Sequence, residues 1–244
     1  MNNQSWEVSV LHLHKGPSLV AVAAVAMLAQ PLAAADQKSE LERISKSTET
    51  LNELVQTPDD RIPEHILQRA EAIVVIPSLI KGGFIVGAEN GKGIMSVRDA
   101  RSGGWSVPSF VAITGGSVGW QIGVQSVDLV LLVMNKDGVN DLLSSEFKLG
   151  GEGSVAAGPV GRTAQAATDA KMGAKILAYS RAKGLFAGLS LQGSSLRDDK
   201  DSNKDLYGKE YSAKDVFAMT PPATLPAEVT RWQQTLRTSA PATR

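Results

Sequence analysis

The position of glycine is the feature that most constrains this chain. Of its 23 glycines, all except Gly16 lie between Gly82 and Gly208. Glycine in a helix interior costs about 1 kcal/mol relative to alanine, so glycine-free segments suit helices. Within strands, glycine marks bulges, bends or the close approach of two backbones. The sequence therefore predicts a glycine-rich sheet in the middle of the chain, with helices before and after it.

The central segment contains several short runs rich in β-branched residues, which predict strands. Asn90-Gly91 separates two of these runs and is typical of a type I′ hairpin turn. Apolar residues alternate with Gly and Gln over 117–125, which predicts one buried face and one nearly bare face. The expected fold class is α+β: a curved, mostly antiparallel, barrel-like β-sheet flanked by N-terminal amphipathic helices and a short C-terminal helix.

Residues 1–35 have the organisation of a secretory signal peptide. Lys15 precedes an apolar run at 19–28, and Ala33-x-Ala35 offers a small-residue cleavage site. That run is too short to span a hydrocarbon layer of about 30 Å. The chain has no cysteine, which excludes disulfides and a lipid-modified cysteine. We expect cleavage before Asp36 and a periplasmic or secreted protein that is not a lipoprotein.

Residues 36–70 contain no glycine and predict two helices that pack on the core. Ser39 and Glu42 match a capping box at the start of the first helix. A stripe at helical spacing suits either packing on the sheet or insertion into a membrane interface, and an excess of Glu favours packing. The stripe consists of Leu41, Ile44, Leu51 and Leu54. At the other end, residues 218–244 predict a Pro-rich tail with one short helix and a loose end.

Two motifs that suggest catalysis lack the context their chemistry requires. Residues 115–119 match G-x-S-x-G, but a strand is expected to follow, and all three histidines precede the serine. In the hydrolase triad the serine sits on a strand-to-helix turn and the histidine follows it in the chain. Residues 151–156 loosely resemble a dinucleotide fingerprint without alternating strands and helices around them. Neither enzymatic activity nor a cofactor is expected.

Residues 199–210 form an acidic segment that could hold a metal. Lys204 stands where an EF-hand loop requires glycine, and a strand is expected before the segment instead of a helix. A solvated acidic turn is therefore favoured over a calcium site, and we expect no metal. The oxygen ligands at near EF-hand spacing would be Asp199, Asp201, Asn203, Asp205 and Glu210.

The formal charge is balanced, with 25 basic and 25 acidic residues, which argues against nucleic-acid binding. Positive charge nevertheless gathers between residues 160 and 184. Such a segment suits either a solvated face or contact with anionic lipid headgroups. The headgroup candidates are Arg162, Lys171, Lys175, Arg181 and Lys183.

Five segments together resemble the SYLF domain family, in family order between about residues 41 and 217. They are GGWSVPSFVAITGGSVGWQIG, VLLVMN, KLGGEGSVAAGPVGR, AYSRAKGLFAGLSLQGS and YGKEYSAKDV. We assign a SYLF-like β-rich domain to residues 71–217. The resemblance implies a non-enzymatic domain that binds phospholipids through an amphipathic N-terminal helix and basic residues. Its fungal members are also called actin-binding, but a secretory leader would place this chain where there is no actin.

Two functions remain open from the sequence. The first is a lipid-binding or phospholipid-binding protein of the bacterial cell envelope, with a membrane surface as its partner. The alternative is a structural or protein-interaction module of the envelope without a specific lipid ligand. In that case the glycine-lined strand face would pack against a protein.

Overall fold

The computed structural model describes residues 20–57, 61–99, 102–144, 146–150, 155–160, 173–182, 185–186 and 191–242. For residues 20–35, 83–86 and 117–123 it describes the backbone alone. The chain divides into two units, Met1–Ala35 and Asp36–Arg244. No helix in the described part of the chain has both the length and the apolar character needed to cross a bilayer. The fold below is that of the second unit.

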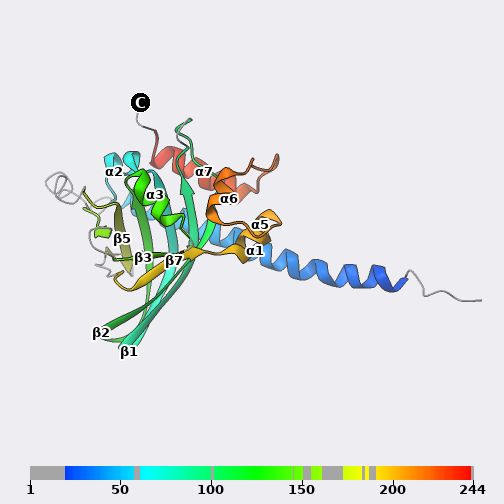
Figure 1. Cartoon of the computed structure of the whole chain (residues 1–244), viewed down its shortest axis with the longest axis horizontal. Coiled ribbons are helices and arrows are strands. Elements are labelled where there is room, and N and C mark those ends of the chain that lie inside the picture. Colours follow the sequence, from blue (N-terminus) through cyan, green and yellow to red (C-terminus); the bar gives the residue numbers. More distant parts are fainter. Residues whose placement is uncertain are drawn as a thin grey trace, which may run out of the picture. The chain divides into compact units, whose positions relative to one another are not determined.

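The structure is α+β, as the glycine pattern predicts (Figure 1). The helices are α1 (Val20–Gln56), α2 (Glu64–Arg69), α3 (Lys136–Leu142), α5 (Lys200–Tyr207), α6 (Ala213–Ala218) and α7 (Ala227–Ser239). The strands are β1 (Ala72–Val97), β2 (Ser109–Val133), β3 (Glu146–Leu149), β4 (Val155–Ala157), β5 (Ile176–Ala182), β6 (Leu185–Phe186) and β7 (Ser194–Asp198). They form one curled, mostly antiparallel sheet in the order β3-β7-β2-β5-β4, with β1 on β2 and β6 on β5.

The two long strands, β1 and β2, form a ribbon that bends back on itself. They pair from Ala72 with Val133 to Met95 with Ser109, with register shifts at two bulges. The expected hairpin at Asn90-Gly91 is therefore wrong, because both residues lie inside β1 and the turn follows Val97. Pairing with β2 along the whole strand outweighs the local turn preference of the dipeptide.

Close approach of two backbones explains the glycine at position 93. A Cβ placed on Gly93 would overlap the carbonyl oxygen of Val75 and lie 2.8 Å from the Cα of Ile76. All three residues belong to β1, so this contact joins the two halves of the bent ribbon. The glycine-rich composition thus allows the sheet to curl, as expected from sequence.

The middle of the ribbon extends past the helices, as Figure 1 shows at the lower left beside the labels β1 and β2. We call residues 80–88 of β1 and 116–126 of β2 the ribbon tip. Strand β2 also pairs with β7 over 111–115 and with β5 over 128–133. Among the strands that the structure describes, only β1 pairs with β2 inside the tip.

Apolar side chains form two core clusters. One lies where α1, α2 and α7 pack on the sheet, and the other contains residues from both halves of the ribbon with α3, β3 and β7. In the first cluster Ile44, Leu51 and Leu54 are fully buried and Leu41 is partly buried, which confirms that this stripe packs on the sheet. The expected capping box is wrong, because α1 begins at Val20 and Ser39 lies inside it.

The C-terminal segment is fixed to the core instead of hanging loose. Val229, Trp232 and Leu236 of α7 are buried, and the Trp232 indole donates to Ser96 Oγ at 2.9 Å. The Arg98 guanidinium lies 4.4 Å from the ring centroid of Trp105. It donates hydrogen bonds to the backbone carbonyls of Gln68, Ala70, Gly103 and Ala240.

Candidate functional site

The expected headgroup residues do not form one described cluster. Lys175 Nζ lies 2.7 Å from Asp141 Oδ2, and this hydrogen bond raises the pKa of Lys175. Arg181 is mostly buried and forms ion pairs with Glu53 and Asp128. The remaining candidates, Arg162, Lys171 and Lys183, lie outside the described residues. Where this group can be followed, it is engaged by carboxylates of the same chain.

The acidic segment at 199–210 forms a helix, so the expected turn is wrong. Asp199 is the N-cap of α5 and accepts a hydrogen bond from the Ser202 N–H at 3.3 Å. Asp201 and Asp205 lie on α5, and Glu210, which follows it, pairs with Lys204. An EF-hand site requires these oxygens to converge from a loop. The described residues contain no group of three or more His, Cys, Asp or Glu arranged to hold a metal ion.

Asn203 has a structural role in this helix. Its side chain is fully buried, and its Oδ1 accepts a hydrogen bond from the Phe110 N–H at 2.9 Å. Its Nδ2 donates to the carbonyl oxygen of Tyr211 at 2.9 Å and to Ser109 Oγ at 3.2 Å. These bonds satisfy buried polar atoms at the start of β2, which explains why α5 packs there.

Basic side chains do gather elsewhere, in a cleft between α1 and β1. The cleft has a volume of about 240 Å³ and contains three cations and two serine hydroxyls. We call it the basic cleft, and it is lined by Ser39, Glu42, Arg43, Lys46, Pro77, Ser78 and Lys92. Helix α1 contributes Arg43 and Lys46, and strand β1 contributes Lys92, so two elements separated in sequence bring positive charge to one site.

A bulge in β1 shapes one wall of the basic cleft. The register with β2 shifts between Ile76 and Leu79, where Pro77 has no N–H to donate. Ser78 has a φ of 56°, and its N–H donates to Asp128 Oδ1 at 3.0 Å. Positive φ is uncommon for a residue other than glycine and is held here by the bulge and this hydrogen bond. The bulge places the exposed Ser78 beside the cations.

Acidic residues at the edge of the cleft hold two of its cations in place. Asp199 Oδ2 lies 2.8 Å from Lys92 Nζ and 3.7 Å from Arg43 Nη1. Burial opposes ionisation of Asp199, but hydrogen bonds from Lys92 and Ser202 outweigh it and lower the pKa of this carboxyl. Arg43 is further held by Glu40, at 2.6 Å. Arg43 is thus fixed by its neighbours.

The surroundings of Glu40 disfavour its ionised form. Burial raises the pKa of Glu40, and the opposite charge of Arg43 offsets this only in part. By contrast, Lys92 and Lys46 are solvent-exposed, and the Lys92 side chain is 52% accessible despite its ion pair. Exposed ammonium groups with nearby hydroxyls suit reversible binding of a phosphate or another anion.

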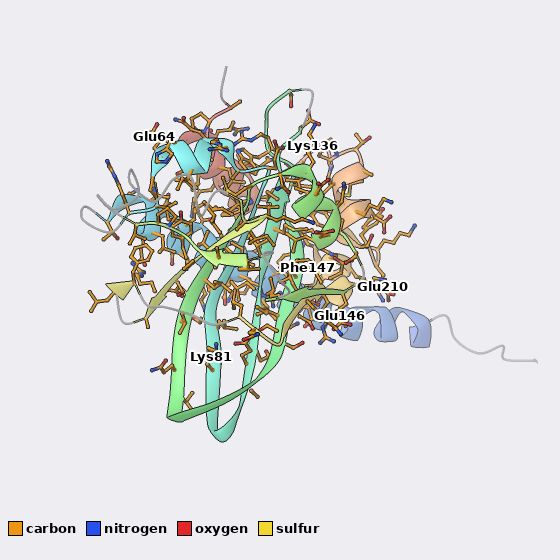
Figure 2. The ribbon with its side chains drawn as sticks, turned by 60° about the vertical axis from the view of Figure 1, so that its left-hand side comes forward. Glu64, Lys81, Lys136, Glu146, Phe147 and Glu210 are labelled. Carbon is orange, nitrogen blue, oxygen red and sulfur yellow. The ribbon has the colours of Figure 1, made fainter. Side chains whose placement is uncertain are left out.

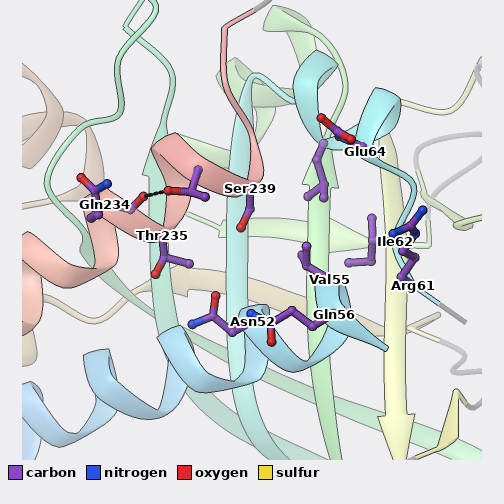
Figure 3. A pocket seen from close by; sticks show the side chains of 11 residues that line it. Asn52, Val55, Gln56, Arg61, Ile62, Glu64, Gln234, Thr235 and Ser239 are labelled. Atoms are coloured by element: carbon purple, nitrogen blue, oxygen red, sulfur yellow. Dashed lines mark hydrogen bonds between the residues drawn. The ribbon is translucent and has the colours of Figure 1, made fainter. Parts of the chain in front are cut away.

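Two other cavities are less suited to a lipid headgroup. One, of about 430 Å³, lies between α1, α2 and α7 and is lined mainly by amide and hydroxyl groups with Arg61 and Glu64 (Figure 3). The second, also about 430 Å³, lies beside Arg98, which is already committed to backbone carbonyls. Among its described lining residues, the first lacks the group of exposed lysines that the basic cleft has, although Val55, Ile62 and Leu67 also line it, and in the second Arg98 is not free to bind a phosphate.

Sequence reasoning could find only part of the basic cleft. Arg43 and Lys46 are three residues apart and flank the apolar stripe of α1, which places them near each other on a helix. No sequence pattern places Lys92 near these two residues, because the expected hairpin put it just after a turn. Its position in the cleft depends on the continuous β1 strand and on the bend of the ribbon.

A family model and similar curated proteins assign this chain to the same family. Residues 114–239 match the family model described as "Ysc84: Las17-binding protein actin regulator". The chain is 38% identical over 176 residues to LAS seventeen-binding protein 3 of Saccharomyces cerevisiae, covering 69% of this chain and 38% of that protein. It is 35% identical over 189 residues to human SH3 domain-containing YSC84-like protein 1, covering 75% and 54%. The chain thus spans between about a third and a half of these relatives.

Proposed function

This chain belongs to the Ysc84 (SYLF) family, a family of non-catalytic binding and regulatory domains, and from that premise we propose that it binds phospholipid at a membrane surface. The basic cleft carries this proposal. Exposed lysines near an anionic surface each contribute about 1 kcal/mol to membrane binding. The cleft contributes Lys46 and Lys92 in that form, with the hydroxyls of Ser39 and Ser78 as hydrogen-bond donors.

The size of the cleft indicates how a lipid would bind. Pockets that enclose a drug-sized ligand have volumes of about 300–1,000 Å³. The basic cleft, at about 240 Å³, is smaller than that range and open to solvent. It suits a headgroup phosphate while the acyl chains stay in the bilayer. We therefore propose a surface-binding protein in preference to a carrier that encloses a whole lipid.

Liposome co-sedimentation tests this proposal. The protein should sediment with vesicles that contain anionic phospholipid and much less with neutral vesicles. Binding should weaken as salt rises, because charges are screened beyond about 8 Å at physiological ionic strength. Replacing Lys46 or Lys92 with glutamate should weaken binding at least about fivefold each. The matched control is Lys214→Glu, at an exposed lysine on α6. Equal binding to neutral and anionic vesicles would reject the headgroup site.

A protein-interaction role is the second candidate, and the names of the relatives favour it. LAS seventeen-binding protein 3 is named for a protein partner, and the matching family is described as an actin regulator. For this chain we place a protein partner second, because the predicted leader would separate it from actin. Failure to bind any vesicle, together with capture of a specific envelope protein by cross-linking, would reverse this order.

We also propose that the protein acts in the cell envelope after removal of residues 1–35. The boundary between the two units of the chain falls between Ala35 and Asp36, at the predicted cleavage site, which supports the proposal. Cleavage there would leave the buried stripe of α1 intact, since Leu41 to Leu54 follow the site. The intact mass of the exported protein should correspond to a chain that begins at Asp36. A full-length cytoplasmic species would contradict export.

A further inference from the structure

The ribbon tip reverses the usual distribution of side chains on a sheet. Val124 is 76% exposed and Ile80 is 45% exposed, although both lie on strands. The expectation that the apolar face of 117–125 is buried is therefore wrong at Val124, its member with a described side chain. Lys81, next to Ile80, forms a 2.8 Å ion pair with the buried Glu89. The Lys81–Glu89 ion pair is therefore largely buried, whereas Ile80 and Val124 are exposed to solvent.

The register places the two exposed residues on one face of the ribbon. Ile80 pairs with Ser126 and Gly82 pairs with Val124. Residues two apart on a strand point to the same side, so Ile80 and Val124 are diagonal neighbours. Leu79 and Val127, on the opposite face, are buried. Where the tip begins, the ribbon thus passes from a buried side at Leu79 and Val127 to strands whose apolar Ile80 and Val124 and polar Gln125 and Ser126 are all exposed.

Among the described helices of the second unit, none covers the tip in the views of Figures 1 and 2, where the ribbon continues past them. Figure 2 labels Lys81 on this part of β1. Lys81 is also the one charged residue in the sequence of the ribbon tip, in a chain that is 20% charged. The two tip strands include Phe84 and Trp120, and tryptophan is enriched at membrane interfaces.

The ribbon tip is continuous with the basic cleft. Ser78, which lines the cleft, precedes Ile80 by two residues in β1. A tip with exposed apolar residues and one paired charge, followed along the chain by the lysines and arginine of the cleft, suits an anionic bilayer, in which phosphates lie outside the acyl chains. A protein partner would require complementary shape and charge on the tip itself, which carries almost no charge.

We propose that the ribbon tip inserts into the interfacial region of an anionic bilayer while the basic cleft contacts lipid phosphates. This inference rests on the proposed function and adds the element that enters the membrane. The insertion is shallow, because the outer edges of a two-stranded ribbon leave backbone N–H and C=O groups that hydrocarbon cannot satisfy. The buried stripe of α1 is unavailable for this role, since it packs on the sheet.

A charge placed in the tip tests the inference on the full chain with vesicles of phosphatidylglycerol and phosphatidylcholine. Val124→Asp should weaken co-sedimentation at least about tenfold and leave the melting temperature unchanged, because the side chain is exposed. The matched control is Leu185→Asp on β6, which replaces another exposed apolar residue outside the tip. It should bind like the unchanged protein. Equal binding by Val124→Asp, or an equal loss in Leu185→Asp, would overturn insertion of the tip while lipid binding itself stands.

Tryptophan fluorescence gives a second readout that does not depend on affinity. Of the four tryptophans, Trp6 in the predicted leader is replaced with Phe in every sample, Trp105 and Trp232 are buried in the core, and Trp120 lies on a tip strand. Lipids brominated near the start of the acyl chains should quench the protein that retains Trp120, and Trp120→Phe should lose that quenching while still binding. Quenching that persists in Trp120→Phe would overturn the inference.

Two further outcomes separate this inference from its alternatives. If no vesicle of either composition binds the unchanged protein, the proposed function fails and the inference fails with it. Sedimentation velocity without lipid tests whether a second copy of this chain, instead of a membrane, covers the ribbon tip. A dimer that Val124→Asp converts to a monomer, with vesicle binding unchanged, would overturn the lipid assignment of the tip.

Discussion

The covered part of the β1–β2 ribbon and its tip are built from the same two strands, yet they bury their side chains very differently. Val75, Val130 and Leu132 are fully buried beneath helices, whereas Val124 of the same strand β2 is 76% exposed. Both parts keep antiparallel pairing between β1 and β2. Strand pairing alone therefore does not decide burial here. The helices that cover one part and stop before the other make the difference.

The largest effect is expected from the helix that covers the sheet. Replacing both Leu51 and Leu54 with alanine removes two fully buried side chains from the core where α1 packs. Each change should cost about 2–5 kcal/mol of unfolding free energy. Thermal or urea unfolding measures the loss. Unchanged stability with lost vesicle binding would instead make α1 the membrane contact and remove the contrast between the covered part and the tip.

A smaller but still large effect is expected where the two halves of the ribbon touch. Gly93→Ala would force a Cβ into the backbone of Val75, and overpacking of this kind costs about 1–3 kcal/mol or more. The matched control is Gly116→Ala in the tip, where the nearest atom to the added Cβ is the Gly87 carbonyl oxygen at 3.8 Å. That substitution should be tolerated. Equal destabilisation of the two variants in urea would contradict this difference, namely that the two halves of the ribbon touch at Gly93 whereas Gly116 has space around it.

Glu40, which pairs with Arg43 of the basic cleft, should make the stability of the protein depend on pH. Burial raises the pKa of Glu40 in the folded protein above the unfolded value near 4.5. The folded state then binds the proton more tightly, so the Glu40 contribution to stability is greatest below pH 4.5 and is lost as pH rises through the raised pKa. The stability of the unchanged protein relative to Glu40→Gln should therefore fall between pH 4 and pH 7. Urea unfolding across that range measures the difference, and a rise with pH would contradict burial as the dominant cause.

The smallest effect on stability is expected at the tip. Ile80→Ala and Val124→Ala shorten apolar side chains that are 45% and 76% exposed, so the free energy of unfolding should change by no more than about 1 kcal/mol. Chemical denaturation of the two variants beside Leu51→Ala provides the comparison. A loss near 2 kcal/mol would mean that another part of the chain covers the tip.

Long-range patterns in the sequence predicted the fold better than short motifs did. Glycine confined to the middle of the chain predicted a curled sheet, and the apolar stripe of α1 predicted packing. Asn90-Gly91 and the acidic segment at 199–210 were misleading, because each motif describes a preference over a few residues. Pairing along all of β1 overrides the first. Capping by Asp199 and the buried hydrogen bonds of Asn203 favour a helix for the second.

By itself, the sequence determined the class of this protein: a cysteine-free, charge-balanced α+β chain with a curled glycine-rich sheet, family motifs and an α1 stripe whose spacing suits burial. Only the tertiary structure decided where that chain meets its surroundings. Lys92 reaches Arg43 and Lys46 because a bulge and a bend bring β1 against α1, and Val124 is exposed because the helices end before the ribbon does. Periodicity reports which residues share a face, whereas exposure depends on what packs against that face, and that is set by contacts between residues far apart in the chain.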